Sequence, residues 1–518
     1  MRIAIAAAVT AALGAGFVIA LVLWGRWSRG RAISAAGRVL KNGAFLLLSQ
    51  FAIKGLDFLF ALAMLRVLGP TGAGQYGYAV LVWLYLKTLT DFGLGTLATQ
   101  GIAAEPDRAG ALLGRTTLLR LLLLVGFAPP FALYVLGSLA TGGVGAVEAG
   151  AFALLALSII PTTYTDAATS VFNGRERFEI PAAVAMLGAL LGLALRLGVL
   201  FAGWGPVGLA SVALAANLVT LVAVAACVRW LGVRAVWSLS RPEAGRLLRA
   251  GWPLLINGLL ASLFFRVDTF ILRPLKGEFV VGLYGVSYQL INTLLVVSST
   301  LTLVLFPQLT RQATEDRAAL ARTHALAVRV LLLIGLPAAT ATALLAPEIV
   351  GIVAGPMFLP GAADALRVTI WLVPLSFVNG VTQYVLIALG LQHRMTWAFL
   401  ATVAFNVSLN LLVIPAYSYR GAAVVSVLSE LVLLVPFALW VRGSLGTFSL
   451  VRLAWQPAVA SAAFALVAWG VGWRLGAGPW AGAAVGAVAY VVALLALGTF
   501  GPEERALIAR FRGAKSNR

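Results

Sequence analysis

Apolar residues in this chain form a series of long runs, separated by short polar connectors. Each run approaches the roughly 20 apolar residues that a helix needs to cross a bilayer. A transmembrane β-barrel would show short segments of alternating polarity instead, and the chain lacks that pattern. We therefore expect an all-α integral membrane protein with about fourteen transmembrane helices, near residues 44–66, 77–101, 117–139, 149–171, 180–202, 206–229, 251–272, 280–306, 325–346, 365–390, 396–414, 421–441, 454–473 and 480–500.

A further apolar run occupies residues 3–24, ahead of these segments. A cleavable signal peptide has basic residues before a core of about 7–15 residues. Here the core is longer and the basic residues follow it. We interpret the run as an extra N-terminal transmembrane helix whose N-terminus lies outside. The alternative is a start codon assigned too far upstream.

Basic residues are distributed unevenly over the connectors. Alternate connectors, which we assign to the cytoplasm, carry 27 Arg and Lys residues, Arg120 and Arg329 among them. Because basic residues are retained on the cytoplasmic side during insertion, this asymmetry predicts the orientation and a cytoplasmic C-terminus. The net charge of +20 is then mainly a topology signal, and its dispersal over many loops does not favour nucleic-acid binding. The opposite connectors carry Arg66, Arg273, Lys276, Arg420 and Arg474.

The composition supports the same class of protein. Hydrophobic residues make up 61% of the chain, charged residues 11%, and the mean hydropathy is +0.97, which excludes a soluble globular protein. The single cysteine, Cys227, excludes an intrachain disulfide and a cysteine-based metal site. His324 and His393 lie in or beside cytoplasmic connectors, and we interpret both as solvated loop residues. No metal or cofactor is expected.

A short pattern recurs along the chain. Asp57 precedes the step Gly74-Gln75-Tyr76-Gly77, and six crossings later Asp268 precedes Gly282-Leu283-Tyr284-Gly285. Because six is an even number, both halves begin on the same side of the membrane. This indicates a parallel duplication, related by an axis along the membrane normal.

The duplication predicts a domain organisation. We expect an N-lobe of six helices over residues 42–240 and a C-lobe of six helices over residues 241–445. Two such lobes can rock about a central cavity, which is a means of alternating access. Residues 1–41 would form the extra helix and a basic linker. Residues 446–518 would form two additional helices and a basic cytoplasmic tail.

Charged residues inside the crossings are the functional candidates, because each costs about 2.5–3.5 kcal/mol at a helix centre. For an anionic headgroup we select Lys54, Arg66, Arg196 and Arg266. The planar guanidinium fork of arginine makes paired hydrogen bonds to phosphate oxygens. Arg196 has no acidic residue within four positions, so its partner lies on another helix or is water or a substrate anion. For Arg66 the alternative is a side chain that reaches the membrane interface.

Four acidic residues complete the candidate site. We predict that Asp57, Asp166, Asp268 and Glu430 act as charge partners or in ion coupling. Asp57 lies three residues after Lys54, on the same helical face, so a local ion pair is the structural alternative. For Asp166 and Glu430, the alternative to a coupling carboxylate is a buried, hydrogen-bonded structural acid.

Several stretches carry a resemblance to a known family. Over residues 43–500, their order and spacing resemble those of Wzx-like polysaccharide-transporter flippases. These belong to the multidrug/oligosaccharidyl-lipid/polysaccharide (MOP) exporter superfamily, which also holds multidrug extrusion transporters and lipid II flippases. The leading helix departs from the usual family pattern. The matching stretches are Leu65-Arg66-Val67-Leu68-Gly69-Pro70, Asp91-Phe92-Gly93-Leu94-Gly95, Phe172-Asn173-Gly174-Arg175-Glu176-Arg177-Phe178, Arg266-Val267-Asp268-Thr269, Phe306-Pro307 and Gly421-Ala422-Ala423, together with Asn410, Pro415 and Glu430.

The resemblance implies a function. A protein of this family resides in the bacterial cytoplasmic (inner) membrane and flips undecaprenyl-diphosphate-linked oligosaccharide outward. The resemblance also implies the polymerase and glycosyltransferases of a polysaccharide pathway as partners. A lipid II flippase is the closest alternative. An ion-coupled multidrug antiporter needs an acidic cavity, whereas basic candidates dominate the first lobe. We expect no enzyme, because the sequence has no HExxH, P-loop or paired-carboxylate signature.

Overall fold

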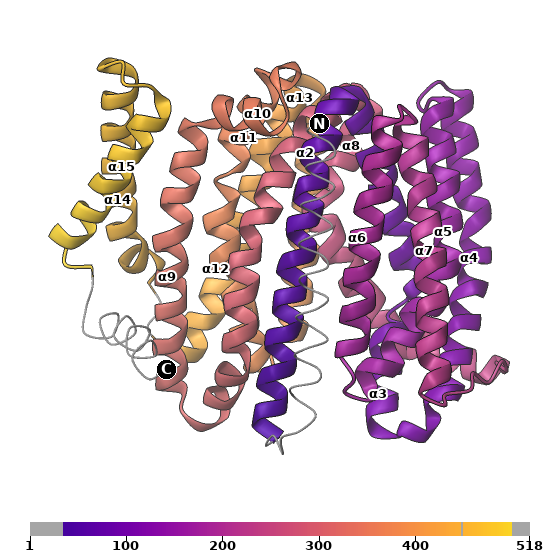
Figure 1. Cartoon of the computed structure of the whole chain (residues 1–518). Helices are drawn as coiled ribbons and strands as arrows, with labels where there is room; N and C mark the ends of the chain where they lie inside the picture. The colour runs from indigo at the N-terminus through magenta and orange to yellow at the C-terminus, as the bar shows by residue number, and fades with distance from the viewer. Residues whose placement is uncertain (1–34, 447–448, 500–518) are drawn as a thin grey trace. The chain divides into compact units, whose positions relative to one another are not determined.

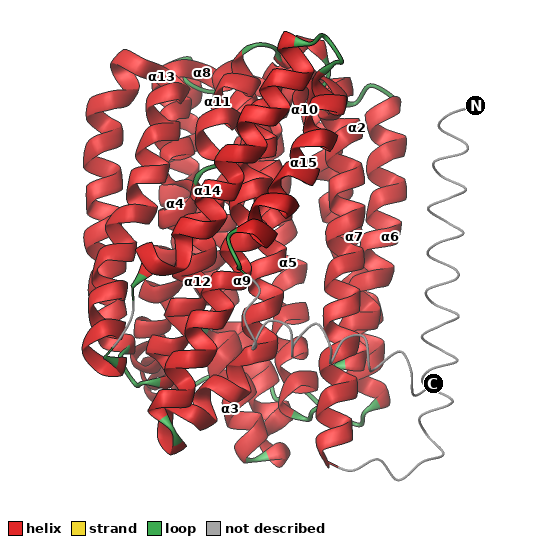
Figure 2. Cartoon of the chain, turned by 90° about the vertical axis from the view of Figure 1, so that its left-hand side faces the viewer, coloured by secondary structure: helices red, strands yellow, loops and turns green. Residues whose placement is uncertain are grey.

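The computed structural model of the chain describes residues 35–446 and 449–499, with side chains described from Ser49 onward. The predicted extra helix at 3–24, the basic linker that follows it and the basic tail lie outside or largely outside these residues. Within the described ranges the chain is helical and contains no strand (Figure 2). The helices are α2 (Ala35–Asp91), α3 (Leu94–Ala104), α4 (Ala109–Ala140), α5 (Ala146–Gly174), α6 (Glu179–Phe201), α7 (Gly205–Trp230), α8 (Arg241–Glu315), α9 (Arg317–Leu344), α10 (Ala346–Val353), α11 (Gly361–Thr369), α12 (Leu372–Ala388), α13 (Gln392–Leu445), α14 (Leu450–Trp469) and α15 (Pro479–Ala496), with helical turns at Pro106–Arg108, Pro356–Phe358 and Gly470–Arg474.

The all-α membrane class is confirmed. Each predicted crossing overlaps a helix or one arm of a long helix, and ten helices in the described part are long and apolar enough to span a membrane. The three longest helices, α2, α8 and α13, each overlap two successive predicted crossings, although the crossing predicted at 77–101 is divided between α2 and α3. Each is broken at one residue with a positive φ: Gly69 (64°), Gly277 (82°) and Ser418 (53°). The count of about fourteen therefore holds approximately.

The chain folds into two compact units, with the boundary between Gly285 and Val286. Unit 1 contains α2 to α7 and the part of α8 up to Gly285, which are indigo to magenta in Figure 1. Unit 2 contains the remainder of α8 and helices α9 to α15. The division into lobes at 42–240 and 241–445 remains a prediction from the sequence.

The duplicated glycine steps contact each other inside unit 1. A Cβ atom placed on Gly74 would lie 1.9 Å from the carbonyl oxygen of Glu278. A Cβ atom on Gly282 would lie 1.9 Å from the carbonyl oxygen of Pro70. Only glycine permits so close a backbone approach. The reciprocal contact is the pattern that a two-fold relation between repeated segments produces.

The structure also sets the register of the repeat. Gly69 and Gly277 break their helices, and each lies five residues before the glycine that opens the next arm. In this register Asp57 lies twelve residues before its break, whereas Asp268 lies nine before its own. The two acids are therefore not equivalent positions, although their order in each half suggested it.

Unit 2 holds its last two helices against α9 by polar contacts. The Arg329 guanidinium donates to Oε1 of Gln456 (2.9 Å) and to the carbonyl oxygen of Thr499 (2.6 Å). The Gln456 amide donates to the carbonyl oxygen of Leu497 at 3.0 Å. Arg329, which we counted with a cytoplasmic connector, lies inside α9 and within the predicted crossing 325–346. A cation near the end of α15 stabilises carbonyl groups that have no partner within the helix.

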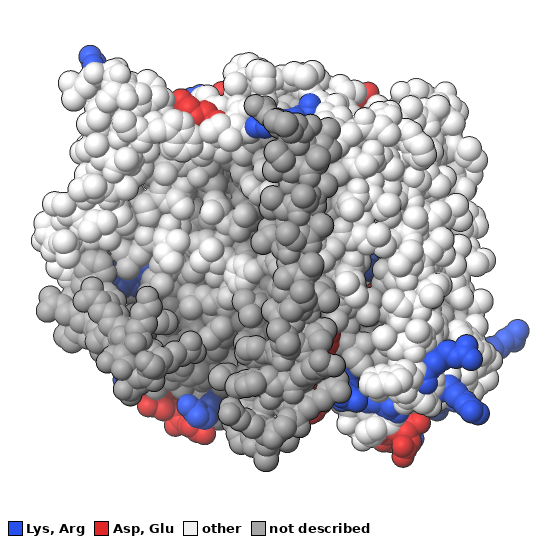
Figure 3. Space-filling model, viewed as in Figure 1, with Lys and Arg blue, Asp and Glu red and all other residues white. Residues whose placement is uncertain are grey.

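Charged side chains gather at the ends of unit 1. In Figure 3, Lys and Arg lie along the lower edge of this unit, at the right of the view, where α3 is found in Figure 1. The wall above them is almost entirely uncharged on the face shown. An uncharged wall bounded by charge is expected of helices embedded in a bilayer.

Candidate functional site

A polar pocket of about 440 Å³ lies within unit 1. Its volume is within the roughly 300–1,000 Å³ usual for small-molecule sites. Four hydroxyls, two amides, two carboxylates and one guanidinium contribute to its wall. The lining residues of this polar pocket are Asp91, Gly95, Thr96, Thr99, Gln100, Arg120, Asp166, Thr169, Ser170 and Asn173.

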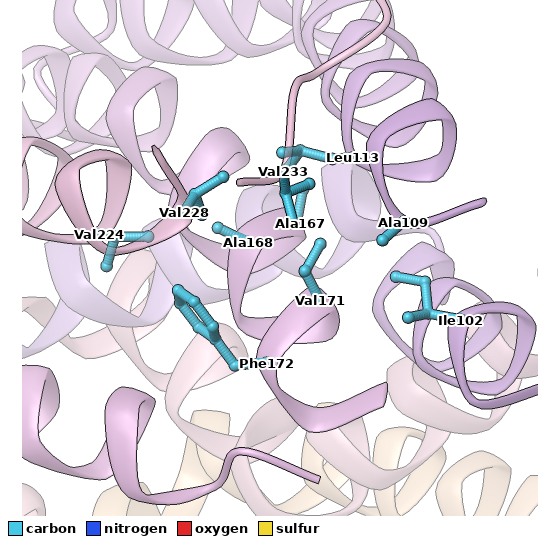
Figure 4. Close-up of a cluster of buried hydrophobic side chains, with 10 residues drawn as sticks. All are labelled: Ile102, Ala109, Leu113, Ala167, Ala168, Val171, Phe172, Val224, Val228 and Val233. Atoms are coloured by element: carbon cyan, nitrogen blue, oxygen red, sulfur yellow. The ribbon is translucent and has the colours of Figure 1, made fainter. Parts of the chain in front are cut away.

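Helix α5 supplies one wall through a polar stripe. Asp166, Thr169, Ser170 and Asn173 follow the i, i+3, i+4, i+7 spacing that places side chains on one helical face. The residues between them lie on the opposite side and are buried in an apolar cluster that α5 shares with α3, α4 and α7 (Figure 4). The packing of that apolar face turns the polar stripe toward the pocket. The stripe was visible in the sequence, although only Asp166 was selected from it.

A tight turn between α2 and α3 shapes a second wall. Phe92 and Gly93 both have positive φ, 51° and 75°, which lets α3 start immediately after Asp91 ends α2. A side chain at Gly93 would collide with Leu254, because its Cβ would lie 2.5 Å from the Leu254 Cβ. Gly93, the first glycine of the Asp-Phe-Gly-Leu-Gly stretch, is therefore required by its positive φ and by the close packing of Leu254. It places α3 so that Gly95, Thr96, Thr99 and Gln100 face the pocket.

The pocket contains an ion pair between Asp91 and Arg120. Arg120 donates from Nε (3.1 Å) and Nη2 (2.6 Å) to Oδ1 of Asp91. The arginine side chain is only 2% exposed, whereas the carboxylate is 35% exposed. Counting Arg120 with the cytoplasmic connectors was wrong, since it lies inside α4 and is almost completely buried. The sequence already held the clue, because residue 120 falls within the predicted crossing 117–139.

A second ion pair lies beside the first. Lys87 Nζ is 3.2 Å from a carboxylate oxygen of Asp166, and both side chains are about one third exposed, 31% and 34%. Asp166 was predicted as a charge partner or coupling acid, and its partner is now identified. Lys87 comes from α2, so this pair connects α2 to α5.

The other predicted residues of unit 1 are not in the polar pocket. Arg196 pairs with Asp57 at 3.7 Å, lies over the Phe60 ring and donates to the carbonyl oxygen of Gly192. Its partner is thus on another helix. Lys54 is exposed and has no ion-pair partner among the described residues, so the local Lys54–Asp57 pair is not formed.

The remaining predicted residues of unit 1 are Arg66 on α2 and Arg266 and Asp268 on α8. Arg66 is exposed and Arg266 is half-buried. Asp268 is buried and accepts hydrogen bonds from the Tyr284 hydroxyl (2.7 Å) and from the backbone of Thr269 (2.6 Å). The bond to Tyr284 connects the two arms of α8 across their break at Gly277.

One buried charge cluster escaped the sequence analysis. Arg273 donates to both carboxylate oxygens of Glu148 and lies 3.3 Å from Glu278. Glu148 is completely buried, and the guanidinium also lies over the Tyr78 ring. Both members were placed in connectors because each lies one residue outside a predicted crossing. The cluster ties the first arm of α8 to α5.

Unit 2 contains a polar cluster without a basic member. Glu430 is 3% exposed and accepts hydrogen bonds from the Ser376 hydroxyl and from the Asn379 amide at 2.7 Å. Beside it, Asn410 donates to Asn406, and Asn406 donates to Ser429, at 2.7 and 2.8 Å. We call these six residues of α12 and α13 the Glu430 cluster. Within the described ranges, Glu430 has no cationic partner.

Two atoms of the Glu430 cluster lack a hydrogen bond. The amide oxygens of Asn379 and Asn410 are buried and unpaired in the described part of the chain. Nearby, His324 is 1% exposed and hydrogen-bonds Thr382 at 3.1 Å. The interpretation of His324 as a solvated loop residue was wrong. Among the described residues there is no group of three or more His, Cys, Asp or Glu side chains arranged to hold a metal ion.

Comparison with known families places the chain. A family model described as "polysaccharide biosynthesis protein" matches residues 39–312, more than half of the sequence. The chain belongs to this family. Among curated proteins, no sequence matches it. The matched stretch contains the whole polar pocket, whereas Glu430 lies beyond it.

Solved structures with the same fold are MOP superfamily members. The lipid II flippase MurJ in an inward closed conformation is 12% identical, with a TM-score of 0.70 over 89% of this chain and 99% of that one. An inward-facing multidrug resistance MATE family transporter is 17% identical, with a TM-score of 0.63 over 76% and 94%. A MOP superfamily transporter from Pyrococcus furiosus, reported to have a binding pocket of reversed polarity, is 17% identical, with a TM-score of 0.54 over 78% and 96%. This family member is therefore a multi-pass membrane protein with the MOP transporter fold.

Proposed function

We propose that this protein is a flippase that moves polyprenyl-diphosphate-linked oligosaccharide from the cytoplasmic to the outer leaflet by alternating access. The observation that carries the proposal is the polar pocket, whose hydroxyl, amide and carboxyl groups lie on α2, α3 and α5, next to α4; of these helices, α4 and α5 are long and apolar enough to span a membrane. A charged, sugar-bearing headgroup crosses hydrocarbon slowly because its polar groups lose their hydrogen bonds to water. A polar cavity in a membrane protein replaces those bonds.

Membership of the polysaccharide biosynthesis family supports a saccharide-bearing substrate. The MOP fold supports transport rather than catalysis, and we propose that the chain is not an enzyme. We place it in the bacterial cytoplasmic membrane with a cytoplasmic C-terminus, because basic residues concentrate on one set of connectors. Its proposed partners are the membrane lipids and the polymerase and glycosyltransferases of one polysaccharide pathway.

Basic side chains outside the polar pocket are proposed to bind the diphosphate. They are Lys54, Arg66, Arg196 and Arg266. Arg196 is supported by its partly exposed guanidinium, 20%, and by its long contact of 3.7 Å to Asp57, which leaves donors for a second anion. Asp57 would hold this guanidinium in place between transport cycles.

Glu430 is proposed as the coupling carboxylate, with Asp166 and Asp268 as structural charge partners. A buried carboxylate without a basic partner is stable only if it is protonated or binds a cation. Unpaired amide oxygens close to it in the Glu430 cluster add neutral oxygen ligands for such a cation. The ion, proton or sodium, is open to experiment.

A lipid II flippase is the second candidate, because the structure of MurJ matches along 99% of its length. Its substrate is a lipid-linked saccharide as well, so the two proposals differ only in the headgroup. The MATE family neighbours suggest multidrug export as a third candidate.

Translocation in vesicles tests the proposal. The full chain would be reconstituted with undecaprenyl-diphosphate-linked N-acetylglucosamine, glucose or galactose, and a sugar-binding lectin outside would report the fraction of headgroups in the outer leaflet. We expect transfer of at least one of these lipids. We also expect transfer to fall about tenfold or more in Arg196→Gln and Arg266→Gln, because each removes charge-assisted hydrogen bonds.

The matched control is Arg311→Gln, which removes an exposed arginine whose ion-pair partner in the described part of the chain is Glu315, at 3.8 Å. Its transfer rate should stay at the wild-type level. Unchanged rates in Arg66→Gln, Arg196→Gln and Arg266→Gln would reject the proposed headgroup residues. A wild-type protein that moves none of the lipids would reject the function.

A further inference from the structure

We infer that the polar pocket of unit 1 is a subsite for the uncharged sugar residues of the substrate, distinct from the cations that would bind the diphosphate. The inference rests on the proposed function. It assigns a ligand class to the ten residues that line the pocket, of which only Asp166 was selected from the sequence.

The charges of the pocket argue against a phosphate ligand. Its only basic lining residue, Arg120, is 2% exposed and is already occupied by Asp91. The accessible charges among its lining residues are the carboxylates of Asp91 and Asp166, which are 35% and 34% exposed, whereas Lys87, which pairs with Asp166, does not line the pocket. Phosphate oxygens are hydrogen-bond acceptors with negative charge, so these carboxylates would repel them. Sugar hydroxyls are donors, and carboxylates accept from them.

The neutral side chains of the pocket are available to a ligand. Thr96, Gln100 and Asn173 make no side-chain hydrogen bond within the described part of the chain. Together they present a hydroxyl and two amides, each able both to donate and to accept. A sugar hydroxyl also donates and accepts, so this wall matches a polyol better than an anion or an apolar drug. Ser170 is different, because it donates to the carbonyl oxygen of Gly95 at 3.1 Å and so joins α5 to α3.

Gly95 lies in the pocket wall formed by α3, next to the Arg120–Asp91 ion pair. A Cβ atom at this position would lie 3.3 Å from Nη2 of Arg120 and 3.5 Å from Oδ1 of Asp91. The backbone of α3 at Gly95 thus lies close to the ion pair, and a larger side chain at this position would press against it. The Arg120–Asp91 pair thus holds one carboxylate in place at the pocket surface, where it can accept from a ligand.

Binding measurements on the full chain in nanodiscs test the inference. The probes are undecaprenyl diphosphate and the same lipid carrying N-acetylglucosamine, glucose or galactose. We expect wild-type protein to bind at least one sugar-bearing lipid more tightly than the bare diphosphate lipid. The variant Thr96→Val with Asn173→Leu should lose about tenfold in affinity for that sugar-bearing lipid. Its affinity for the bare lipid should not change.

The matched control combines Thr165→Val and Asn217→Leu. Thr165 lies one turn before Thr169 on α5 and bonds its own helix, at Pro161, and neither control residue lines the pocket. This control should bind all four lipids like the wild type.

Three outcomes would overturn the inference. In the first, the variant Thr96→Val with Asn173→Leu loses as much affinity for the bare diphosphate lipid as for the sugar-bearing lipid. In the second, this variant loses affinity for neither lipid. In the third, the wild type binds no sugar-bearing lipid more tightly than the bare lipid. A wild-type protein that binds the bare lipid without any sugar preference rejects the subsite alone. A protein that binds none of the four lipids rejects the proposed function with it.

Discussion

The polar pocket of unit 1 and the Glu430 cluster of unit 2 both place carboxylates among apolar helices, but the carboxylates have different partners. In the pocket, Asp91 faces Arg120 and Asp166 faces Lys87. In the cluster, Glu430 is surrounded by a hydroxyl and an amide, and no basic side chain pairs with it within the described residues.

This difference separates a fixed charge from a changeable one. An ion pair with a buried arginine keeps its carboxylate ionised, because removing either charge leaves the other uncompensated. A carboxylate held only by neutral donors can gain a proton or a cation without leaving a charge unpaired. This difference agrees with our proposals that the pocket recognises a ligand and that Glu430 acts in coupling.

The largest expected effect is that of Asp91→Asn, which leaves the buried Arg120 charge without compensation. We expect the free energy of unfolding to fall by about 3–5 kcal/mol. Thermal unfolding of the purified full chain would measure it. The double variant Asp91→Asn with Arg120→Met should recover part of the loss, since it removes both charges. A single variant as stable as the wild type would show that the pair does not hold the pocket together.

An intermediate effect is expected for Glu430→Gln. Ser376 and Asn379 each donate to one oxygen of the native carboxylate. Glutamine has only one acceptor oxygen, so one of these buried donors loses its acceptor. We expect the free energy of unfolding to fall by about 1–3 kcal/mol. Transport in vesicles should also lose its dependence on an imposed proton or sodium gradient. Asn379→Ala is a useful companion, because it removes a donor but retains the carboxylate. A loss of stability as large as that of Asp91→Asn would mean that Glu430 balances a buried positive charge.

The smallest effect is expected for Lys87→Met. Both side chains of the Lys87–Asp166 pair are about one third exposed, so solvent screens the pair and the loss should be about 0–1 kcal/mol. Thermal unfolding of Lys87→Met and of Asp91→Asn, measured side by side, would compare the Lys87–Asp166 pair with the Arg120–Asp91 pair. Equal losses would contradict the distinction between a buried and a half-exposed pair.

Much of the fold could be predicted from the sequence because the bilayer imposes it. Each apolar run must form a helix that satisfies its own backbone, so runs such as 149–171 and 180–202 identify α5 and α6. The duplicated Gly-x-Tyr-Gly steps indicated a repeat, but that the two steps contact each other came from the structure, and the flanking acids suggested a wrong register.

The candidate site was predicted less well, for a physical reason. Arg120 and Arg329 were counted with connectors because each lies close to a helix end, although both fall within predicted crossings, and only packing shows which groups they contact. The Arg273–Glu148 pair joins residues 125 positions apart, and nothing local in the sequence connects them.

The sequence by itself determined the membrane class, the helices, the repeat and the polar stripe of α5, because these follow from hydrophobicity and helical periodicity along a local stretch. The tertiary structure alone decided which charges meet. Asp57 could pair with Lys54 three residues away, yet it pairs with Arg196 on α6. The energy of an ion pair depends on distance and burial in space, and both are set by the helices that pack together rather than by separation along the chain.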